Sequence, residues 1–126
     1  MRLLLDTHTL LWWLADDSRL CRAAARAIED GANAVLVSAA SIWEIEIKRA
    51  KGALTAPGDI LEQVAAAGFD LMPITAVHAR EAGRLPRRHE DPFDRMLVAQ
   101  AAAENATLIT SDEAIPGYGV AVLRAG

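Results

Sequence analysis

The chain has 126 residues, of which 52% are hydrophobic and 24% charged. This composition excludes intrinsic disorder, which needs a more polar chain, and the length predicts one compact domain over residues 1–126. The single cysteine, Cys21, excludes an internal disulfide, and no Cys/His cluster indicates zinc. No apolar run suits a signal peptide or a membrane span, so we expect a cytoplasmic protein.

The negative charge of the chain is concentrated at a few positions. The formal net charge is −4, from 13 basic and 17 acidic residues, which is not the balance of a typical nucleic-acid-binding domain. Four acids stand directly after predicted strands or early in predicted helices: Asp6, Glu44, Asp94 and Asp112. Without these four the two signs balance. The excess is therefore local, and bound Mg²⁺ would reverse it and accept a phosphate.

Short apolar runs alternate with stretches of helical periodicity along the first half of the chain. A buried strand is predicted over Arg2–Leu5, with Thr7 as the N-cap of a short helix that carries Leu10, Leu11 and Leu14 on one face. The next predicted elements are a helix over Arg19–Glu29 capped by Ser18, a strand over Ala34–Val37, and a helix over Ala39–Ala50 with possible caps at Ser38 and Ser41 and an end at Gly52.

The second half continues the same alternation. Pro57-Gly58 opens a helical segment with Ile60, Leu61 and Val64, which Gly68 ends. The remaining predicted elements are a strand over Phe69–Ile74, a helix from Thr75 to Arg84, a basic loop over Pro86–Glu90, a helix from Asp91-Pro92 to Glu104, and strands over Thr107–Thr110 and Gly119–Leu123.

This alternation predicts an α/β domain of three layers, with a central, mainly parallel five-stranded sheet between helices. In such sheets functional groups collect just beyond the carboxyl ends of the strands. Asp6 and Asp112 each follow a predicted strand directly, so their carboxylates could converge. Each could equally cap the helix that comes after it.

The other two acids also have simple local explanations. Glu44 could be a surface residue that pairs with Lys48 one helical turn away. Asp94 falls in the first turn of its helix, where the helix dipole favours an acid. Asp91, directly before Pro92, is the better N-cap and leaves Asp94 free for another role.

Four such acids in one domain predict a metal site more readily than four separate caps and pairs. Carboxylates held close together must bind cations or share protons. Mg²⁺ prefers carboxylate and water oxygens and needs neither histidine nor cysteine. Metal-assisted hydrolysis of a phosphodiester is the chemistry that suits such a site.

These residues resemble the four motifs of PIN domains, most closely those of the VapC-type toxins of bacterial toxin–antitoxin pairs. The matching segments span nearly the whole chain: Leu4-Leu5-Asp6-Thr7-His8, the helix of Glu44, Asp91-Pro92-Phe93-Asp94-Arg95 with Ala99-Gln100-Ala101, and Leu108-Ile109-Thr110-Ser111-Asp112. The resemblance implies an endoribonuclease that uses Mg²⁺ or Mn²⁺. It assigns the metal to Asp6, Glu44, Asp94 and Asp112, with Thr110 and Asp91 in support. It also implies a homodimer and a small antitoxin that covers the active-site groove.

Basic and aromatic residues give weaker signals about partners. Arg84, Arg87, Arg88, His89 and Arg95 surround the loop before Asp94, and we expect this group to follow RNA phosphates. Arg95 has the best case because PIN domains carry arginine there, and Lys48 on the Glu44 helix is a further candidate. Trp12, Trp13 and Trp43 could form an apolar groove for an antitoxin helix, although core or dimer packing is favoured for Trp43.

Two alternatives belong to other functional classes. A phosphoryl-transfer receiver domain has this length and fold class, but it needs an acidic pair after the first strand and a lysine after the last. Here Asp6 is followed by Thr7-His8, and the last predicted strand leads to Arg124. A PIN-like module that binds RNA or protein without cleaving is the other alternative, and metal-dependent turnover distinguishes it from a nuclease.

Overall fold

A computed structural model describes residues 1–56 and 58–126; Pro57, predicted to open the fourth helix, lies outside this part. Its centre is a five-stranded sheet in the order β3-β2-β1-β4-β5, in which every pair of neighbouring strands is parallel. The strands are β1 (Arg2–Leu5), β2 (Ala34–Ser38), β3 (Asp70–Met72), β4 (Thr107–Thr110) and β5 (Val122–Arg124). The predicted α/β architecture is confirmed.

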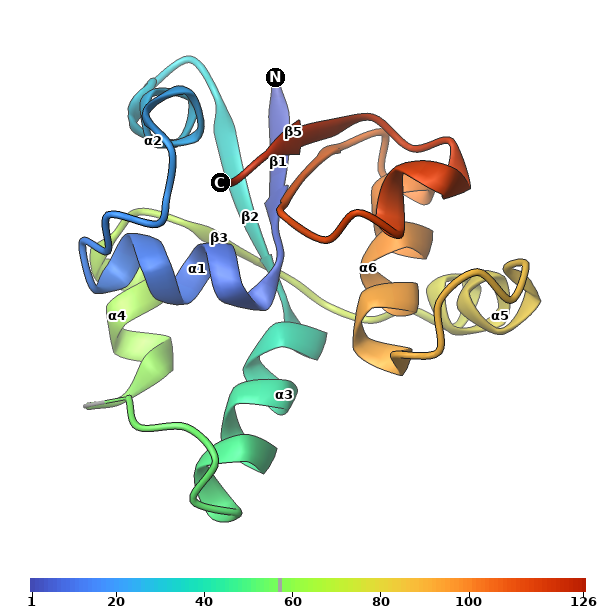
Figure 1. Ribbon diagram of the computed structural model, residues 1–126, viewed down its shortest axis with the longest axis horizontal. Helices are drawn as coiled ribbons and strands as arrows, with labels where there is room; N and C mark the ends of the chain where they lie inside the picture. The colour runs from blue at the N-terminus through green and yellow to red at the C-terminus, as the bar shows by residue number, and fades with distance from the viewer. Residues whose placement is uncertain (57) are drawn as a thin grey trace.

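Helices cover both faces of the sheet (Figure 1). They are α1 (Thr7–Leu14), α2 (Arg22–Glu29), α3 (Ala39–Ala50), α4 (Ile60–Ala66), α5 (Ala76–Arg84) and α6 (Pro92–Ala103), with a short 3₁₀ helix η1 (Ile115–Tyr118). One core joins β1 and β2 to α1, α2, α3 and α4, and the other joins the opposite face to α6 and η1. Figure 1 places α5 beyond α6, at the outer side of the second layer.

The central strand β1 explains why the sheet is buried on both faces. Leu3, Leu4 and Leu5 are all fully buried, because successive side chains of a strand point to opposite faces and helices cover both. Leu3 and Leu5 enter the first core, and Leu4 enters the second. The run of three leucines therefore supplies both cores at once.

Several predicted boundaries move by a few residues. Helix α2 begins at Arg22, with Cys21 rather than Ser18 at its N-cap. Strand β3 ends before Pro73, which has no N–H to donate to a sheet. Strand β5 begins three residues later than predicted, because Ile115–Tyr118 forms η1 and Gly119 closes it with a φ of 79°.

The strand order places one functional edge at the middle of the sheet. β1 lies between β2 and β4, so β2 and β3 extend the sheet on one side of β1, and β4 and β5 extend it on the other. The two sides meet at the carboxyl end of β1. There Leu5 pairs with Val37 on one side and with Ile109 on the other. Ligands of open α/β sheets bind at such switch points. Within the described part of the chain, no helix combines the length and the apolar character needed to cross a membrane.

Candidate metal centre

A cavity of about 350 Å³ opens at the carboxyl ends of β1 and β4, between the first turns of α1 and α6 and the middle of α3. It is lined by Asp6, Thr7, His8, Glu44, Lys48, His89, Asp91, Asp94, Ser111 and Asp112. All four acids singled out in the sequence thus line one space, although they come from four separate segments of the chain.

Asp6 is buried at the end of β1 and both of its carboxylate oxygens are held. Its Oδ1 accepts from the Thr9 backbone N–H at 2.8 Å, and its Oδ2 accepts from the Thr110 hydroxyl at 2.5 Å. Asp6, not Thr7, is therefore the N-cap of α1. The prediction of Thr7 as the cap was wrong because the chain turns into the helix directly after the strand. Only Oδ1 takes part in the cap, and the Asp6 side chain also lines the cavity.

Glu44 is also buried, and its two oxygens have different partners. Oε1 accepts from the Thr7 hydroxyl at 2.6 Å, and Oε2 accepts from Lys48 Nζ at 2.7 Å. The pair with Lys48 is present, as the local explanation required, but Glu44 is only 5% exposed. The hydrogen bond to Glu44 raises the pKa of Lys48. Glu44 is thus not an ordinary surface residue.

The local cap of α3 differs from one of the predicted possibilities. The Ser38 hydroxyl accepts from the Ala40 N–H and caps the helix. Ser41 forms no capping box with Glu44, since its hydroxyl is buried without a hydrogen-bond partner among the described residues. Glu44 is therefore directed to the cavity instead of to the start of its own helix.

Asp91 and Asp94 occupy the N-terminus of α6 in the predicted arrangement. The Asp91 carboxylate accepts from the N–H groups of Phe93 and Asp94 and caps the helix. Asp94 lies in the first turn with its side chain 20% exposed. Burial, followed by the negative charges of Asp91 and Asp6, raises the pKa of Asp94 to about 7. This carboxylate is therefore held where negative charge is costly unless a cation joins it.

The fourth acid, Asp112, follows β4 and is bound by a residue that the sequence did not place in the centre. His89 Nε2 lies 2.7 Å from Asp112 Oδ2 and 3.1 Å from Asp94 Oδ2. Burial acts to raise the pKa of Asp112, but the Ala114 N–H and His89 outweigh it and lower that pKa. Burial acts to lower the pKa of the His89 imidazole, but the hydrogen bond to Asp112 and the surrounding carboxylates outweigh it and raise that pKa.

The donor set fits a hard divalent cation, because carboxylate oxygens from four segments face a small polar cavity. The atoms nearest to one another are those of His89, Asp94 and Asp112, which all lie within 4.8 Å. Asp6 and Glu44 line the same cavity but are not part of this tightest group. The high pKa of Asp94 is the observation that most directly calls for added positive charge.

Known proteins resemble this chain in sequence and in fold. The family model for the PIN domain matches residues 3–120. The chain belongs to the PIN-domain family. Ribonuclease VapC22 of Mycobacterium tuberculosis is 33% identical to it over 123 residues, which cover 91% of this chain and 90% of that protein. This PIN domain is accordingly of the VapC type, as its motifs predicted.

Solved structures share its fold at low sequence identity. The chain matches a structure of VapBC2 from Rickettsia felis, bound to a DNA fragment from its promoter, with a TM-score of 0.70, 15% identity and full coverage of both chains. It matches VapBC-5 of Mycobacterium tuberculosis, described as a member of a family of toxin–antitoxin systems, with a TM-score of 0.60 and 20% identity over 98% of this chain and 96% of that one.

Around the centre of this PIN domain, the cations predicted to contact RNA differ in their surroundings. Lys48 lines the cavity, and Arg88 is exposed in the loop before α6. Both terminal nitrogens of Arg95 donate to backbone carbonyls, those of Ala82, Leu85, Pro86 and His89. Arg95 therefore orders the loop that carries His89, and a contact with RNA would have to use its remaining Nε–H.

The three tryptophans of the PIN domain differ in their burial. Trp43 is 61% exposed and contacts Phe93 edge to face, with ring centroids 5.5 Å apart. Packing of Trp43 in the core, one of the favoured possibilities, is thus wrong: Glu44 is turned inward, and the neighbouring side chain points outward. Trp12 and Trp13 are half-buried against the first core.

Thr110 connects two of the acids and allows a test of the centre's stability. Its hydroxyl donates to Asp6 and accepts from the Asp112 backbone N–H at 3.0 Å. We expect Thr110→Val to lower the free energy of unfolding by about 1–3 kcal/mol, because a buried carboxylate loses its donor. Urea denaturation measures this, with Thr107→Val on the same strand as the control. Equal stability of the two variants would contradict the role of this hydroxyl.

Proposed function

We propose that this chain is a metal-dependent endoribonuclease, formed by a single PIN domain over residues 1–126, and the toxin of a toxin–antitoxin pair. The observation that carries the proposal is the cavity lined by Asp6, Glu44, Asp94 and Asp112, in which burial, followed by neighbouring negative charges, raises the pKa of Asp94. The name of the relative VapC22, a ribonuclease, supports RNA as the substrate. Mg²⁺ is the proposed cation, with Mn²⁺ as a substitute, because the four ligands offer oxygen only.

In this proposal the four acids hold the cation and other residues keep them in place. A divalent cation bound here would supply Lewis acidity for the hydrolysis of a phosphodiester. Thr110 holds Asp6, and Thr7 holds Glu44. Asp91 sets the first turn of α6, on which Asp94 lies. Hydrolysis joins the water oxygen to phosphorus, breaks the bond to the 3′ oxygen and leaves a proton on that oxygen.

Positive groups at the rim would orient the RNA strand. Lys48 Nζ is bound to Glu44 at the wall of the cavity, and the Lys48 side chain remains 40% exposed, so it can approach a phosphate. Arg88 and, through its free N–H, Arg95 are further candidates. These contacts would compensate for the acidic balance of the chain as a whole.

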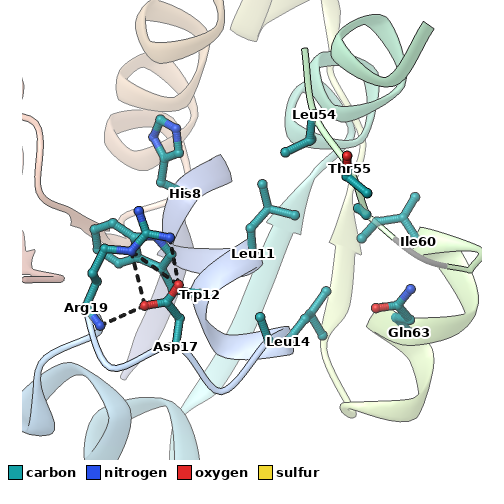
Figure 2. Close-up of a pocket in the computed structure, with 12 residues that line it drawn as sticks. His8, Leu11, Trp12, Leu14, Asp17, Arg19, Leu54, Thr55, Ile60 and Gln63 are labelled. Atoms are coloured by element: carbon teal, nitrogen blue, oxygen red, sulfur yellow. Dashed lines mark hydrogen bonds and ion pairs between the residues drawn. The ribbon is translucent and has the colours of Figure 1, made fainter. Parts of the chain in front are cut away.

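We further propose that a small antitoxin covers this region. A second cavity of about 390 Å³ lies between α1 and the segment before α4 (Figure 2). Its floor is apolar, with Leu11, Leu14, Leu54 and Ile60. It shares His8 with the acidic cavity, so a segment that inserts apolar side chains here would also reach the entrance of the metal centre. Fold relatives solved as VapBC complexes support an antitoxin as the occupant.

Two further expectations accompany the proposal. A homodimer is proposed from the family resemblance, and the exposed apolar surface of Trp43, Leu61 and Leu71 offers room for a second copy. A cytoplasmic location stays a prediction, which the single cysteine, Cys21, supports.

Cleavage of labelled single-stranded and structured RNA tests the proposed activity. We expect cleavage with Mg²⁺ and with Mn²⁺ and none with EDTA, because the acids alone cannot activate water without a cation. The four acids, each changed singly to its amide, should lose this activity. Folded protein that leaves every RNA intact in the presence of metal would instead favour a module that binds RNA or protein without cleaving it.

A further inference from the structure

The imidazole of His89 sits between two of the acids of the proposed metal centre. It comes from the loop between α5 and α6, and its Nε2 lies 2.7 Å from Asp112 Oδ2 and 3.1 Å from Asp94 Oδ2. Its side chain is 18% exposed. Arg95 binds the His89 carbonyl at 3.3 Å, so the position of the loop is fixed from α6 itself. Two roles are compatible with these distances, a metal ligand or a hydrogen-bond donor.

The other ring nitrogen distinguishes these two roles. His89 Nδ1 accepts a hydrogen bond from the backbone N–H of Asp91 at 3.1 Å. A backbone amide can only donate, so Nδ1 has no proton and the neutral ring carries its proton on Nε2. A histidine that ligates a metal through one nitrogen donates the N–H of the other to an acceptor. Here the nitrogen that faces the acids is the protonated one.

We propose that His89 is a positioning residue of the metal centre: a fixed Nε2–H donor that holds the carboxylate of Asp112, lies beside that of Asp94 and is not itself a ligand. This inference rests on the proposed function, because it assigns the donor to that same metal site. The Ala114 N–H holds the other oxygen of Asp112 at 2.9 Å. With both oxygens oriented, Asp112 presents its remaining lone pairs in one direction.

Asp91 connects this donor to the helix that carries Asp94. Its backbone N–H fixes the tautomer of His89, while its carboxylate caps α6 and accepts from the Asp94 N–H at 3.3 Å. A single residue therefore orients the donor and the helical turn that carries the neighbouring carboxylate of Asp94. This gives Asp91, whose part in the family pattern is a supporting one, a specific task.

Metal affinity and the ring tautomer test the proposal without reference to RNA cleavage. Calorimetric titration with Mn²⁺ should show an affinity lower by about 10- to 100-fold in His89→Ala, as is usual when a group that orients a ligand is lost. His89→Gln should recover part of that loss, because its amide N–H can reach a similar position. Glu90→Ala, an exposed neighbour in the same loop, should bind like the unaltered protein.

Nitrogen-15 spectra of the histidine rings give the second readout. We expect the neutral imidazole ring of His89 to carry its proton on Nε2, both before and after saturation of the protein with Mg²⁺. A proton on Nδ1 in the Mg²⁺-bound protein would overturn the proposal and make His89 a ligand. Unchanged Mn²⁺ affinity in folded His89→Ala would also overturn it, as would a loss in His89→Gln as large as that in His89→Ala.

Failure of the proposed function gives a different pattern. If Asp6→Asn and Asp94→Asn bound Mn²⁺ as tightly as the unaltered protein, the cavity would not be a metal centre at all. If those variants lost their affinity for Mn²⁺ and His89→Ala kept it, the metal centre would be supported and only the proposed role of His89 would be contradicted.

Discussion

Asp6→Asn is expected to reduce metal-dependent RNA cleavage by on the order of 10³-fold while the protein stays folded. The loss follows because an amide removes one of the four negative charges that are proposed to hold the cation. The fold should persist because asparagine caps a helix about as well as aspartate does. Its amide oxygen can accept from the Thr9 N–H, as Asp6 Oδ1 does at 2.8 Å.

A matched variant separates the charge from the cap. Asp59 also caps a helix, α4, and accepts from the Leu61 N–H at 2.9 Å, but it lies outside the acidic cavity. Asp59→Asn should therefore cleave RNA like the unaltered protein. Circular dichroism and the urea midpoint report the fold of both variants. Cleavage by a well-folded Asp6→Asn protein would remove Asp6 from the proposed site.

Asp94→Asn is expected to stabilise the metal-free protein at about pH 8, by roughly 1–3 kcal/mol. The pKa of Asp94 is raised from 3.8 to about 7, so the folded state binds this proton more tightly than the unfolded state. The free energy of unfolding must then fall as the pH rises from about 4 to about 7 and stay low above that range. The full shift corresponds to about 4 kcal/mol, which adjustment of neighbouring charges should reduce.

Unfolding measured across this pH range with EDTA, and again with saturating Mg²⁺, checks the expectation. At about pH 4 the two proteins should be nearly equally stable, and the advantage of Asp94→Asn should grow towards neutral pH. Mg²⁺ should raise the free energy of unfolding of the unaltered protein, because an ion that binds the folded state stabilises it. It should have little effect on Asp94→Asn, which lacks one of the proposed ligands. Glu113→Gln, an exposed acid nearby, is the control. A difference in the free energy of unfolding between the two proteins that does not change with pH would contradict the burial of charge at Asp94.

Both experiments concern residues whose positions were largely predictable from the sequence. Asp91-Pro92 indicated the start of α6, and the structure has Asp91 as the cap and Asp94 in the first turn. Thr75 was likewise the predicted start of α5 and caps it. Such signals are local, because a cap acts on N–H groups two or three residues away. Where several candidates stand close together the cap is harder to predict: Thr7 and Ser18 were predicted as caps, and the structure has Asp6 and Cys21 instead.

Other features depend on contacts between distant segments. Thr110 and Asp6 are 104 residues apart, and their hydrogen bond exists only because β4 pairs with β1. His89 was assigned to a basic rim, since no periodicity places a loop residue over a particular strand end. For Trp43 packing in the core or in a dimer was expected, and its exposure excludes the core, because apolar character alone does not say which face of a helix turns inward.

The sequence by itself determined the alternation of strands and helices, the family and the strand-end placement of Asp6 and Asp112, because these follow from local hydrophobic patterns and short motifs. Only the tertiary structure decided that Asp6 serves as a cap and a cavity wall together, that His89 bridges Asp94 and Asp112, and that Arg95 binds its own loop. The physical reason is that a polar side chain pairs with whichever donor or acceptor the packed chain brings within about 3 Å, and burial makes that pairing obligatory.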